Sequence, residues 1–251
     1  MKRPIFLALL LGLVTLPFLT LPTPGSGQVT HAPDYEYRLM IPSITIPAIP
    51  DAPFTATVRT EIVRRLEDGS TIVRKNHRLV ARDSSGRVFQ ERRMLTPDDD
   101  TQQSPLTRLE FDNPVSHEKY LCDPQGRVCH VSPFYPPPLE AQASFQGNTD
   151  QVTRVTIGNS MISGVETLGT REMTIIPAST AASNRPLTVT KEFWYSSQLG
   201  VNIVVKRYDP RVGNQNYLVT DLVLGEPNSS LLEPPAGATI MRNTPQTPPE
   251  N

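Results

Sequence analysis

Short runs of β-branched and aromatic residues, each ended by Gly, Asp or Pro, recur along most of this chain. The clearest series lies in residues 54–95, where FTATVRTEIVRRL and TIVRKNHRLVARD are followed by the turns EDGS and DSSG, and RVFQERRML runs back. This spacing is typical of an antiparallel meander. No long stretch shows the periodicity of an amphipathic helix. The sequence therefore predicts a mostly β protein.

Further runs of the same kind bring the expected total to about ten strands. They lie at 106–112, 118–122, 127–131, 152–162, 165–177 and, as a closing meander, 187–225. Residues 132–150, SPFYPPPLEAQASFQGNTD, interrupt the pattern as either a short helix or a crossing loop. We expect few short helices and one β domain over residues 54–240.

The first 27 residues have the three-part layout of a secretory signal peptide. Lys2 and Arg3 precede an uncharged apolar run at 5–21, and small residues follow before Gln28. A retained membrane anchor is the alternative, but the run is shorter than the ~20 residues of a comfortable span and contains proline. With no Cys near the cleavage point, we expect a periplasmic or secreted protein without a lipid-anchored cysteine and without an integral membrane span.

The two ends of the mature chain are rich in proline. Residues 28–53 carry five prolines, which disfavour both a helix and a central strand, so we predict an extended arm or linker there. Its apolar residues suggest that it lies against a surface. Residues 241–251 are polar and proline-rich, and we predict a disordered tail.

The only two cysteines lie in the segment YLCDPQGRVCHV. Its DPQG sequence is good turn chemistry. If Asp123 pairs with Val128, Cys122 faces Cys129 directly across a hairpin, within disulfide range. In an oxidising compartment this spacing predicts a structural disulfide.

The closing meander is apolar on both faces. Val201, Ile203 and Val205 share one face of a strand and Val204 lies on the other; in the next strand Tyr217 and Val219 oppose Leu222. Such strands must be covered on both faces. The cover is a second β-layer, the arm 28–53, or an apolar ligand. For a ligand, the expected cavity residues are Val189, Phe193, Trp194, Tyr195, Val201, Ile203, Val205 and Leu222.

An arginine-rich stretch lies between residues 59 and 93. Arg74, Arg78 and Arg82 are an even number of residues apart and share one strand face, which Arg92 extends if the register allows. The stripe predicts an anionic-surface site for phosphate head groups or polysaccharide. The alternative is an exposed face of cross-strand ion pairs.

No catalytic or metal-binding pattern is found. The four His residues lack a metal-ligand spacing, and SHEK at 116–119 matches S-x-x-K without the helix or companion motifs that this chemistry needs. The formal net charge of −1 gives no field favouring nucleic acid. We expect no enzyme activity, no cofactor and no metal.

Residues 155–238 resemble the periplasmic lipoprotein-carrier and outer-membrane lipoprotein-sorting group (LolA/LolB-like). The features that carry the resemblance are GNSMISGVETLGTREMTIIP at 158–177, Trp194 and Leu199-Gly200, and the ending NYLVTDLVLGEPNSSLLEPPAGA. The resemblance implies a strongly curved antiparallel sheet, an incomplete barrel, whose concave face holds acyl chains or an apolar lid.

Together these observations predict a non-enzymatic exported envelope protein that binds an apolar or amphiphilic ligand, lipid or lipoprotein acyl chains, on a concave β-sheet. The alternative is an envelope protein-interaction or sensor module without a small ligand, in which the arm 28–53 and the basic hairpins dock a protein partner.

Overall fold

The computed structural model describes residues 43–97, 104–136 and 152–242. The predicted signal peptide, the first part of the arm at 28–42, most of the interruption at 132–150 and residues 243–251 lie outside the described residues. Strands dominate the described part, and the predicted mostly β class is confirmed. None of its helices has the length and apolar character needed to cross a membrane.

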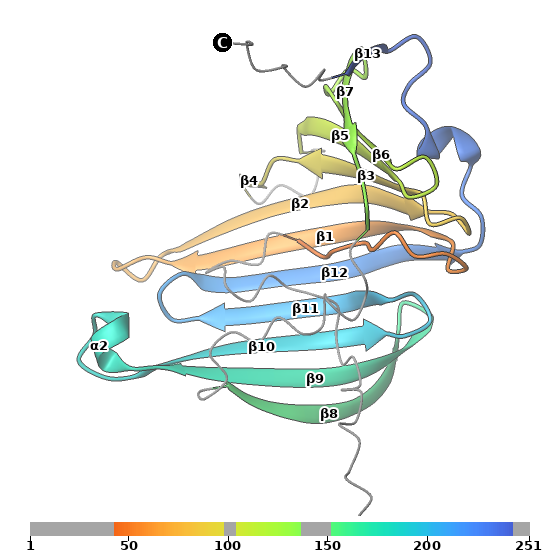
Figure 1. Ribbon diagram of the computed structural model, residues 1–251. Helices are drawn as coiled ribbons and strands as arrows, with labels where there is room; N and C mark the ends of the chain where they lie inside the picture. The colour runs from red at the N-terminus through yellow and green to blue at the C-terminus, as the bar shows by residue number, and fades with distance from the viewer. Residues whose placement is uncertain (1–42, 98–103, 137–151, 243–251) are drawn as a thin grey trace, which may run out of the picture.

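The strands form a single unclosed sheet (Figure 1). Its order is β13-β7-β6-β5-β3-β2-β1-β12-β11-β10-β9-β8, and β4 pairs with β2 outside this path. The bounds are β1 Phe54–Arg65, β2 Thr71–Arg82, β3 Val88–Arg93, β4 Thr96–Pro97, β5 Leu106–Asn113, β6 Glu118–Cys122, β7 Val128–Pro133, β8 Val152–Ile162, β9 Val165–Ile176, β10 Leu187–Ser196, β11 Val201–Asp209, β12 Gly213–Leu224 and β13 Thr239–Arg242. Two short elements accompany them, the helix α2 Ala178–Ala181 and the 3-10 helix η2 Ser229–Leu232.

The described residues contain thirteen strands rather than about ten. The additional ones are short pieces that carry little sequence signal. β4 is two residues long, and β13 pairs in parallel with β7, placing Ile240 opposite Cys129. β13 also extends to Arg242, into the segment predicted as a tail. All the other pairings are antiparallel, as the meander pattern predicted.

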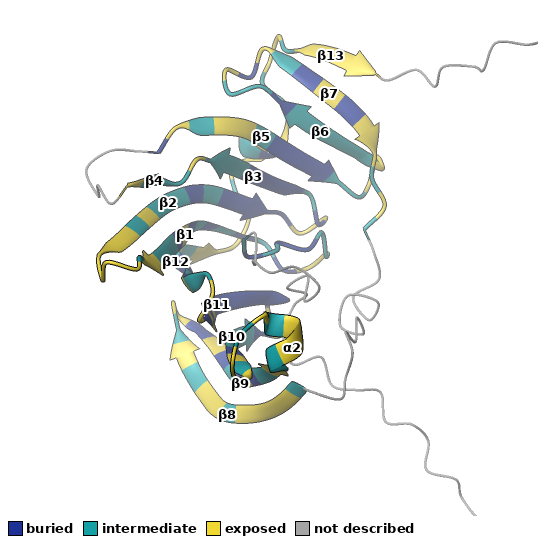
Figure 2. Cartoon of the chain, turned by 90° about the vertical axis from the view of Figure 1, so that its left-hand side faces the viewer, coloured by how far each residue is buried: buried dark blue, intermediate teal, exposed yellow. Residues whose placement is uncertain are grey.

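The sheet bends around one hydrophobic cluster. This cluster includes both Val80 on β2 and Val165 on β9, although four strands lie between β2 and β9 in the sheet order. Residues so far apart along the sheet pack into one cluster only if the sheet curves toward it. The incomplete barrel that the sequence predicted is therefore present, with β8 and β13 at its two edges (Figure 2).

We call the side of the sheet that faces this cluster the inner face. Residues 43–53, the described part of the predicted arm and hereafter the strap, cross it without forming a helix or strand. In Figure 1 the strap is the orange trace in front of β1 and β12. Ile44 and Ile46 of the strap are buried in the inner cluster. The strap, the described part of the arm, thus covers the inner face, and cover by the arm is one of the alternatives that the sequence left open.

A second cluster lies on the outer face of the other half of the sheet. Ala81, the neighbour of Val80, points the opposite way and packs with Phe89 and Phe111, whose ring centroids are 5.2 Å apart. Leu232 of η2 covers this group, together with Leu231 and Ala238. The segment after β12 therefore covers the outer face, while the strap covers the inner one.

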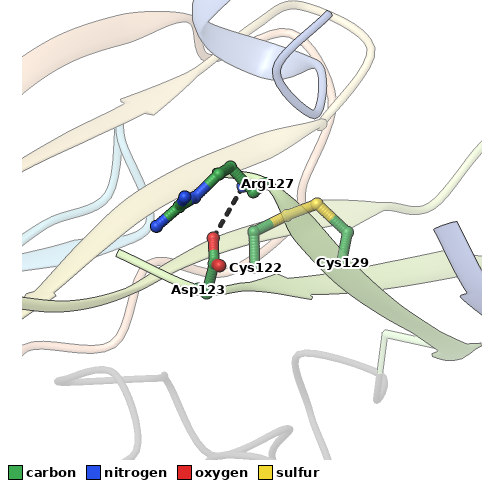
Figure 3. The surroundings of a disulfide bond; sticks show 4 residues. All are labelled: Cys122, Asp123, Arg127 and Cys129. Carbon is green, nitrogen blue, oxygen red and sulfur yellow. Dashed lines mark hydrogen bonds between the residues drawn. A yellow bond between two sulfur atoms is a disulfide. The ribbon is translucent and has the colours of Figure 1, made fainter. Parts of the chain in front are cut away.

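The disulfide belongs to the outer cluster. Cys122 and Cys129 are directly opposed on β6 and β7 and are bonded to each other, as predicted (Figure 3). Asp123 N–H donates to the carbonyl of Val128 at 2.9 Å, and the Asp123 carboxylate accepts from Arg127 N–H at 2.7 Å. The bond thus closes the hairpin on which Leu232 packs.

Candidate functional site

The inner face of β1 and β10–β12 is the most apolar surface of the sheet. Phe193, Val205 and Tyr217 form one row across β10, β11 and β12, because each is the cross-strand partner of the next. Val58 and Val219 form the neighbouring row across β1 and β12. All five are buried. Side chains that share a row on one face contact each other, so this region is a continuous apolar surface.

The structure brings most of the predicted ligand residues together on this surface. Val189 is buried, and the inner cluster contains Phe193, Val201, Ile203 and Val205. Their present cover includes strap residues Ile44 and Ile46, in the same cluster.

Leu222 reaches the same cluster through an irregularity in β12. The pairing of β1 with β12 shifts between Thr55 and Thr57, and Asp221 takes a positive φ of 51°. The extra residue reverses the alternation, so Leu222 packs with Val219 instead of opposing it, and Val223 is 66% exposed. The predicted opposition of Tyr217 and Val219 to Leu222 is therefore wrong.

Trp194 and Tyr195 are placed differently from the other candidates. Trp194 pairs with Val204 and points away from the row of Phe193, and its indole N–H donates to the Glu192 carboxylate at 2.9 Å. Glu192 also forms an ion pair with Arg171 at 3.0 Å. Trp194 is nevertheless only partly exposed and packs against the inner cluster, which also contains its cross-strand partner Val204. The Tyr195 hydroxyl lies near Gly200, where Pro47 and Ile49 in the middle of the strap also approach.

Arg78 holds the start of the strap. Its guanidinium donates to Ser43 Oγ from Nε at 3.2 Å and from Nη2 at 2.9 Å, and Nη2 also donates to the Ile44 carbonyl at 2.8 Å. Nη1 donates to the Gln90 side chain at 2.9 Å. The planar fork of an arginine suits this set of acceptors because its donors have fixed directions.

Arg82 holds the other end of the strap and is completely buried. It donates to the Pro47 carbonyl at 2.8 Å, to the Leu199 carbonyl at 2.6 Å, and twice to the Ala52 carbonyl, at 2.9 and 2.8 Å. Its guanidinium also lies 5.0 Å from the centre of the Phe54 ring. Arg82 therefore ties the strap to β2 and to the turn before β11.

Burial disfavours the charged form of both guanidinium groups. It lowers the pKa of Arg78 to about 9, with a smaller contribution from the positive charge of Arg92, and it lowers the pKa of Arg82 to about 10. Both values lie above neutrality, so both side chains are cationic under ordinary conditions.

These contacts change the interpretation of the predicted arginine stripe. Arg78 and Arg82 are interior groups that bond to main-chain carbonyls, and Arg74 on the same strand is exposed. Arg92 pairs with Glu110 at 2.8 Å. The four arginines therefore do not form one surface for anions, because the strap takes up the donors of two of them. One feature of the sequence does point to arginines that hold the strap: arginines alternate along a strand in a chain that also has an apolar proline-rich arm.

The inner face of β3, β5 and β6 is polar. Gln90 is the cross-strand partner of both Val80 and Glu110, so this polar surface continues directly from the apolar one. Glu110 and Asp112 are buried, and Asp112 forms an ion pair with Lys119 at 2.7 Å. We call the group Arg92, Arg108, Glu110, Asp112 and Lys119 the charged patch.

The two carboxyl groups of the charged patch differ in acidity. Burial alone raises the pKa of Glu110, but the hydrogen bond from Arg92 and the charges of Arg92, Lys119 and Arg108 hold it below its ordinary value. Burial raises the pKa of Asp112 above its ordinary value despite the contact with Lys119. The stronger cationic surroundings of Glu110 account for the difference.

At one end of the inner face a buried ion pair stabilises β11. Arg207 lies 2.7 Å from Asp209, and Asp209 also contacts Arg211 at 2.8 Å. Burial alone raises the pKa of Asp209, but hydrogen bonds from Arg211 and the two positive charges hold it below its ordinary value. Within residues 43–97, 104–136 and 152–242, no group of three or more His, Cys, Asp and Glu could hold a metal ion.

No protein-family model and no curated protein matches this chain. Among solved structures, it is similar to a chain of the MucA/MucB complex of Pseudomonas aeruginosa, at 13% identity and a TM-score of 0.40, covering 77% of this chain and 59% of that one. A LolA superfamily protein from Nitrosomonas europaea matches at 9% identity and a TM-score of 0.30, over 74% and 91% of the two chains. The Mycobacterium tuberculosis lipoprotein LppX matches at 10% identity and a TM-score of 0.27, over 69% and 87%.

The chain spans less than two thirds of the length of the MucB-complex chain that it matches. A LolA superfamily structure is among the matches, as the resemblance of residues 155–238 predicted. At these identities and TM-scores, the similarities carry no argument about a ligand or a partner. The chain is thus a curved, unclosed β-sheet protein with LolA superfamily and lipoprotein structures among its distant matches.

Proposed function

We propose that this protein is exported, has no enzymatic activity, and binds an apolar or amphiphilic component of the cell envelope on its inner face. The ligand class is a lipid or the acyl chains of a lipoprotein. The observation that carries the proposal is the cover of the inner cluster: a buried apolar surface on a bowed sheet lies beneath a strap without regular secondary structure. An acyl chain, which is also extended and apolar, takes the place of the strap on this surface.

The strap and an acyl chain would gain comparable free energies from burial on this surface. Burying an isoleucine side chain contributes about 1.5–3 kcal/mol, so Ile44 and Ile46 together contribute about 3–6 kcal/mol. An acyl chain gains about 0.8 kcal/mol for each buried methylene, so about six methylenes on this surface gain about 5 kcal/mol. Because the hydrophobic effect is not directional, the surface accepts either cover.

The disulfide supports the exported location. Cys122 and Cys129 are bonded, and disulfides persist in oxidising compartments such as the periplasm and the extracellular space. This agrees with the signal-peptide layout of residues 1–27. The structure describes residues 43–53 of the arm on the protein's own sheet, so the alternative in which the arm docks a protein partner gains no support from these residues.

The test is uptake of an acyl probe by the mature protein purified from the periplasm. Native mass spectrometry should detect co-purifying lipid, and titration with a fluorescent fatty acid should show saturable binding. Delipidated protein that takes up no probe would overturn the proposal.

A variant of Ser43 tests the place of the strap. S43A removes the hydroxyl that accepts two donors of Arg78 and loosens the strap by about 1 kcal/mol. If the acyl chain displaces the strap, the apparent affinity for the probe should rise about fivefold. S70A is the matched control, because Ser70 lies in the exposed β1–β2 turn, away from the strap, where it bonds to Asp68 and Leu66. Equal affinity of S43A and S70A would place the probe elsewhere.

A further inference from the structure

Resting on the proposed function, we infer that the charged patch beside the apolar surface binds the anionic headgroup of the amphiphile, a carboxylate or a phosphate. The charged patch lies directly beside the apolar surface. Gln90 links the patch to the apolar surface, since Val80 is its partner on β2 and Glu110 is its partner on β5. A ligand whose chain lies on the inner cluster therefore meets the charged patch at its polar end.

The balance of charge in the patch is positive. Arg92, Arg108 and Lys119 contribute three positive charges and Glu110 and Asp112 two negative ones. The neighbouring Arg78, which is hydrogen-bonded to the strap, adds another positive charge. It is close enough to Arg92 for the repulsion between the two charges to lower the pKa of Arg78. The excess of positive charge favours an anion over a cation at this place.

The positive groups are also the accessible ones. The side chains of Arg92, Arg108 and Lys119 are 34%, 49% and 28% exposed, whereas those of Glu110 and Asp112 are 6% and 10% exposed. The carboxylates therefore form the floor of the patch, and the cations are the groups that an incoming ligand meets first.

Two opposed arginines are unfavourable without an anion. Arg92 and Arg108 are direct cross-strand partners on β3 and β5, a placement in which like charges destabilise a sheet. They share one carboxylate: Nη2 of Arg92 lies 2.8 Å from Glu110, and Nε of Arg108 lies 3.2 Å from it. A guanidinium carries five N–H donors, so both side chains keep donors for a second anion.

The ligand class follows from this donor set. Paired guanidinium groups recognise planar or tetrahedral oxyanions through two parallel N–H bonds. A fatty-acid carboxylate and a phosphate headgroup both provide such oxygens, whereas an uncharged sugar or a trimethylammonium headgroup carries no negative charge at the end of the chain.

The test compares amphiphiles that share one chain and differ in headgroup. Calorimetric titrations of the delipidated mature protein would use dodecanoate, dodecyl phosphate, dodecyl maltoside and dodecyltrimethylammonium, each below its micelle concentration. We expect the two anions to bind about tenfold more tightly than the neutral maltoside, with the cation weakest. The stronger of the two anions identifies the source as a carboxylate or a phosphate.

The variant R108Q tests the patch itself. Arg108 is half exposed and its removal leaves Arg92 on Glu110, so the fold is retained, and a thermal-unfolding scan checks this. Affinity for the anions should fall about fivefold while affinity for dodecyl maltoside is unchanged. R64Q, at an exposed position near the tip of β1, makes the same charge change away from the patch and should leave all affinities unchanged.

The outcomes separate this inference from the proposed function. Equal binding of anionic and neutral amphiphiles, or equal loss of anion affinity in R108Q and R64Q, would overturn the headgroup site and leave acyl binding on the inner face intact. If none of the amphiphiles binds, the proposed function fails and the headgroup site fails with it.

Discussion

Replacement of Arg82 by methionine should loosen the strap and destabilise the whole sheet. Methionine keeps much of the length of the arginine side chain and removes all of its donors. The change removes the Arg82 donors from the main-chain carbonyls of Ala52 and Leu199, and one of the two donors of the Pro47 carbonyl, which also accepts from Ile49 N–H at 3.0 Å. Arg82 is 0% exposed, so water does not reach the position to replace these bonds in the folded state.

The size of the effect follows from the number of acceptors. A buried carbonyl that loses its partner costs about 1–3 kcal/mol, so those of Ala52 and Leu199 together cost at least about 2 kcal/mol, and the loss of one of two bonds at the Pro47 carbonyl adds to this. The folded R82M variant no longer buries a cation, and the desolvation cost that is avoided offsets part of the lost hydrogen-bond energy. We therefore expect the free energy of unfolding to fall by about 2–4 kcal/mol.

Urea unfolding monitored by the fluorescence of Trp194, the single tryptophan of the chain, measures this difference. Hydrogen exchange of the strap amides should show faster exchange in R82M. R74M is the matched control, because Arg74 is exposed on the same strand and its replacement should change stability by less than about 0.5 kcal/mol. If the free energy of unfolding of R82M lies within about 1 kcal/mol of the wild-type value, the bonds from Arg82 do not hold the strap.

Three further predictions concern the disulfide, the buried ion pair and acid stability. Replacing both Cys122 and Cys129 by serine should lower the free energy of unfolding by about 2 kcal/mol, as a short closed loop predicts; an unchanged thermal midpoint would contradict this. D209N leaves Arg207 buried without its charged partner and should cost about 3–5 kcal/mol in urea unfolding, whereas D221N, at an exposed position, should cost little. The pKa of Glu91, which burial alone raises, is held below its ordinary value of 4.5 by hydrogen bonds from Arg93 and Leu79 N–H. A carboxyl group with a lowered folded pKa contributes stability that is full above its unfolded pKa and is lost as pH falls through the folded value. Urea midpoints should therefore fall below about pH 4.5, and E91Q should flatten this dependence.

The local features of the sequence were predicted correctly because their causes are local. The turn sequence after Asp123 places Cys122 opposite Cys129 through contacts within one hairpin. The same holds for the strands of the meander, whose β-branched residues and short turns determine pairing with the next strand. Even the cover of the inner face by the arm was among the alternatives that the sequence left open.

Features that depend on one extra residue or on distant contacts were not predictable. The bulge at Asp221 reverses the alternation of β12 and moves Leu222 to the inner face, yet Asp221 carries no pattern that announces it. The positions of Arg78 and Arg82 depend on strap carbonyls more than thirty residues away. A charged residue at alternate strand positions is equally compatible with an exposed face.

The sequence by itself determined a mostly β chain, its antiparallel meanders and its disulfide hairpin, because hydrogen-bonded neighbours in a meander are also neighbours along the chain. Only the tertiary structure decided which face of each half of the sheet is covered, and by which segment. The strap lies on the inner face and the segment after β12 on the outer one, since burial depends on how the whole sheet curves and where its two ends meet it.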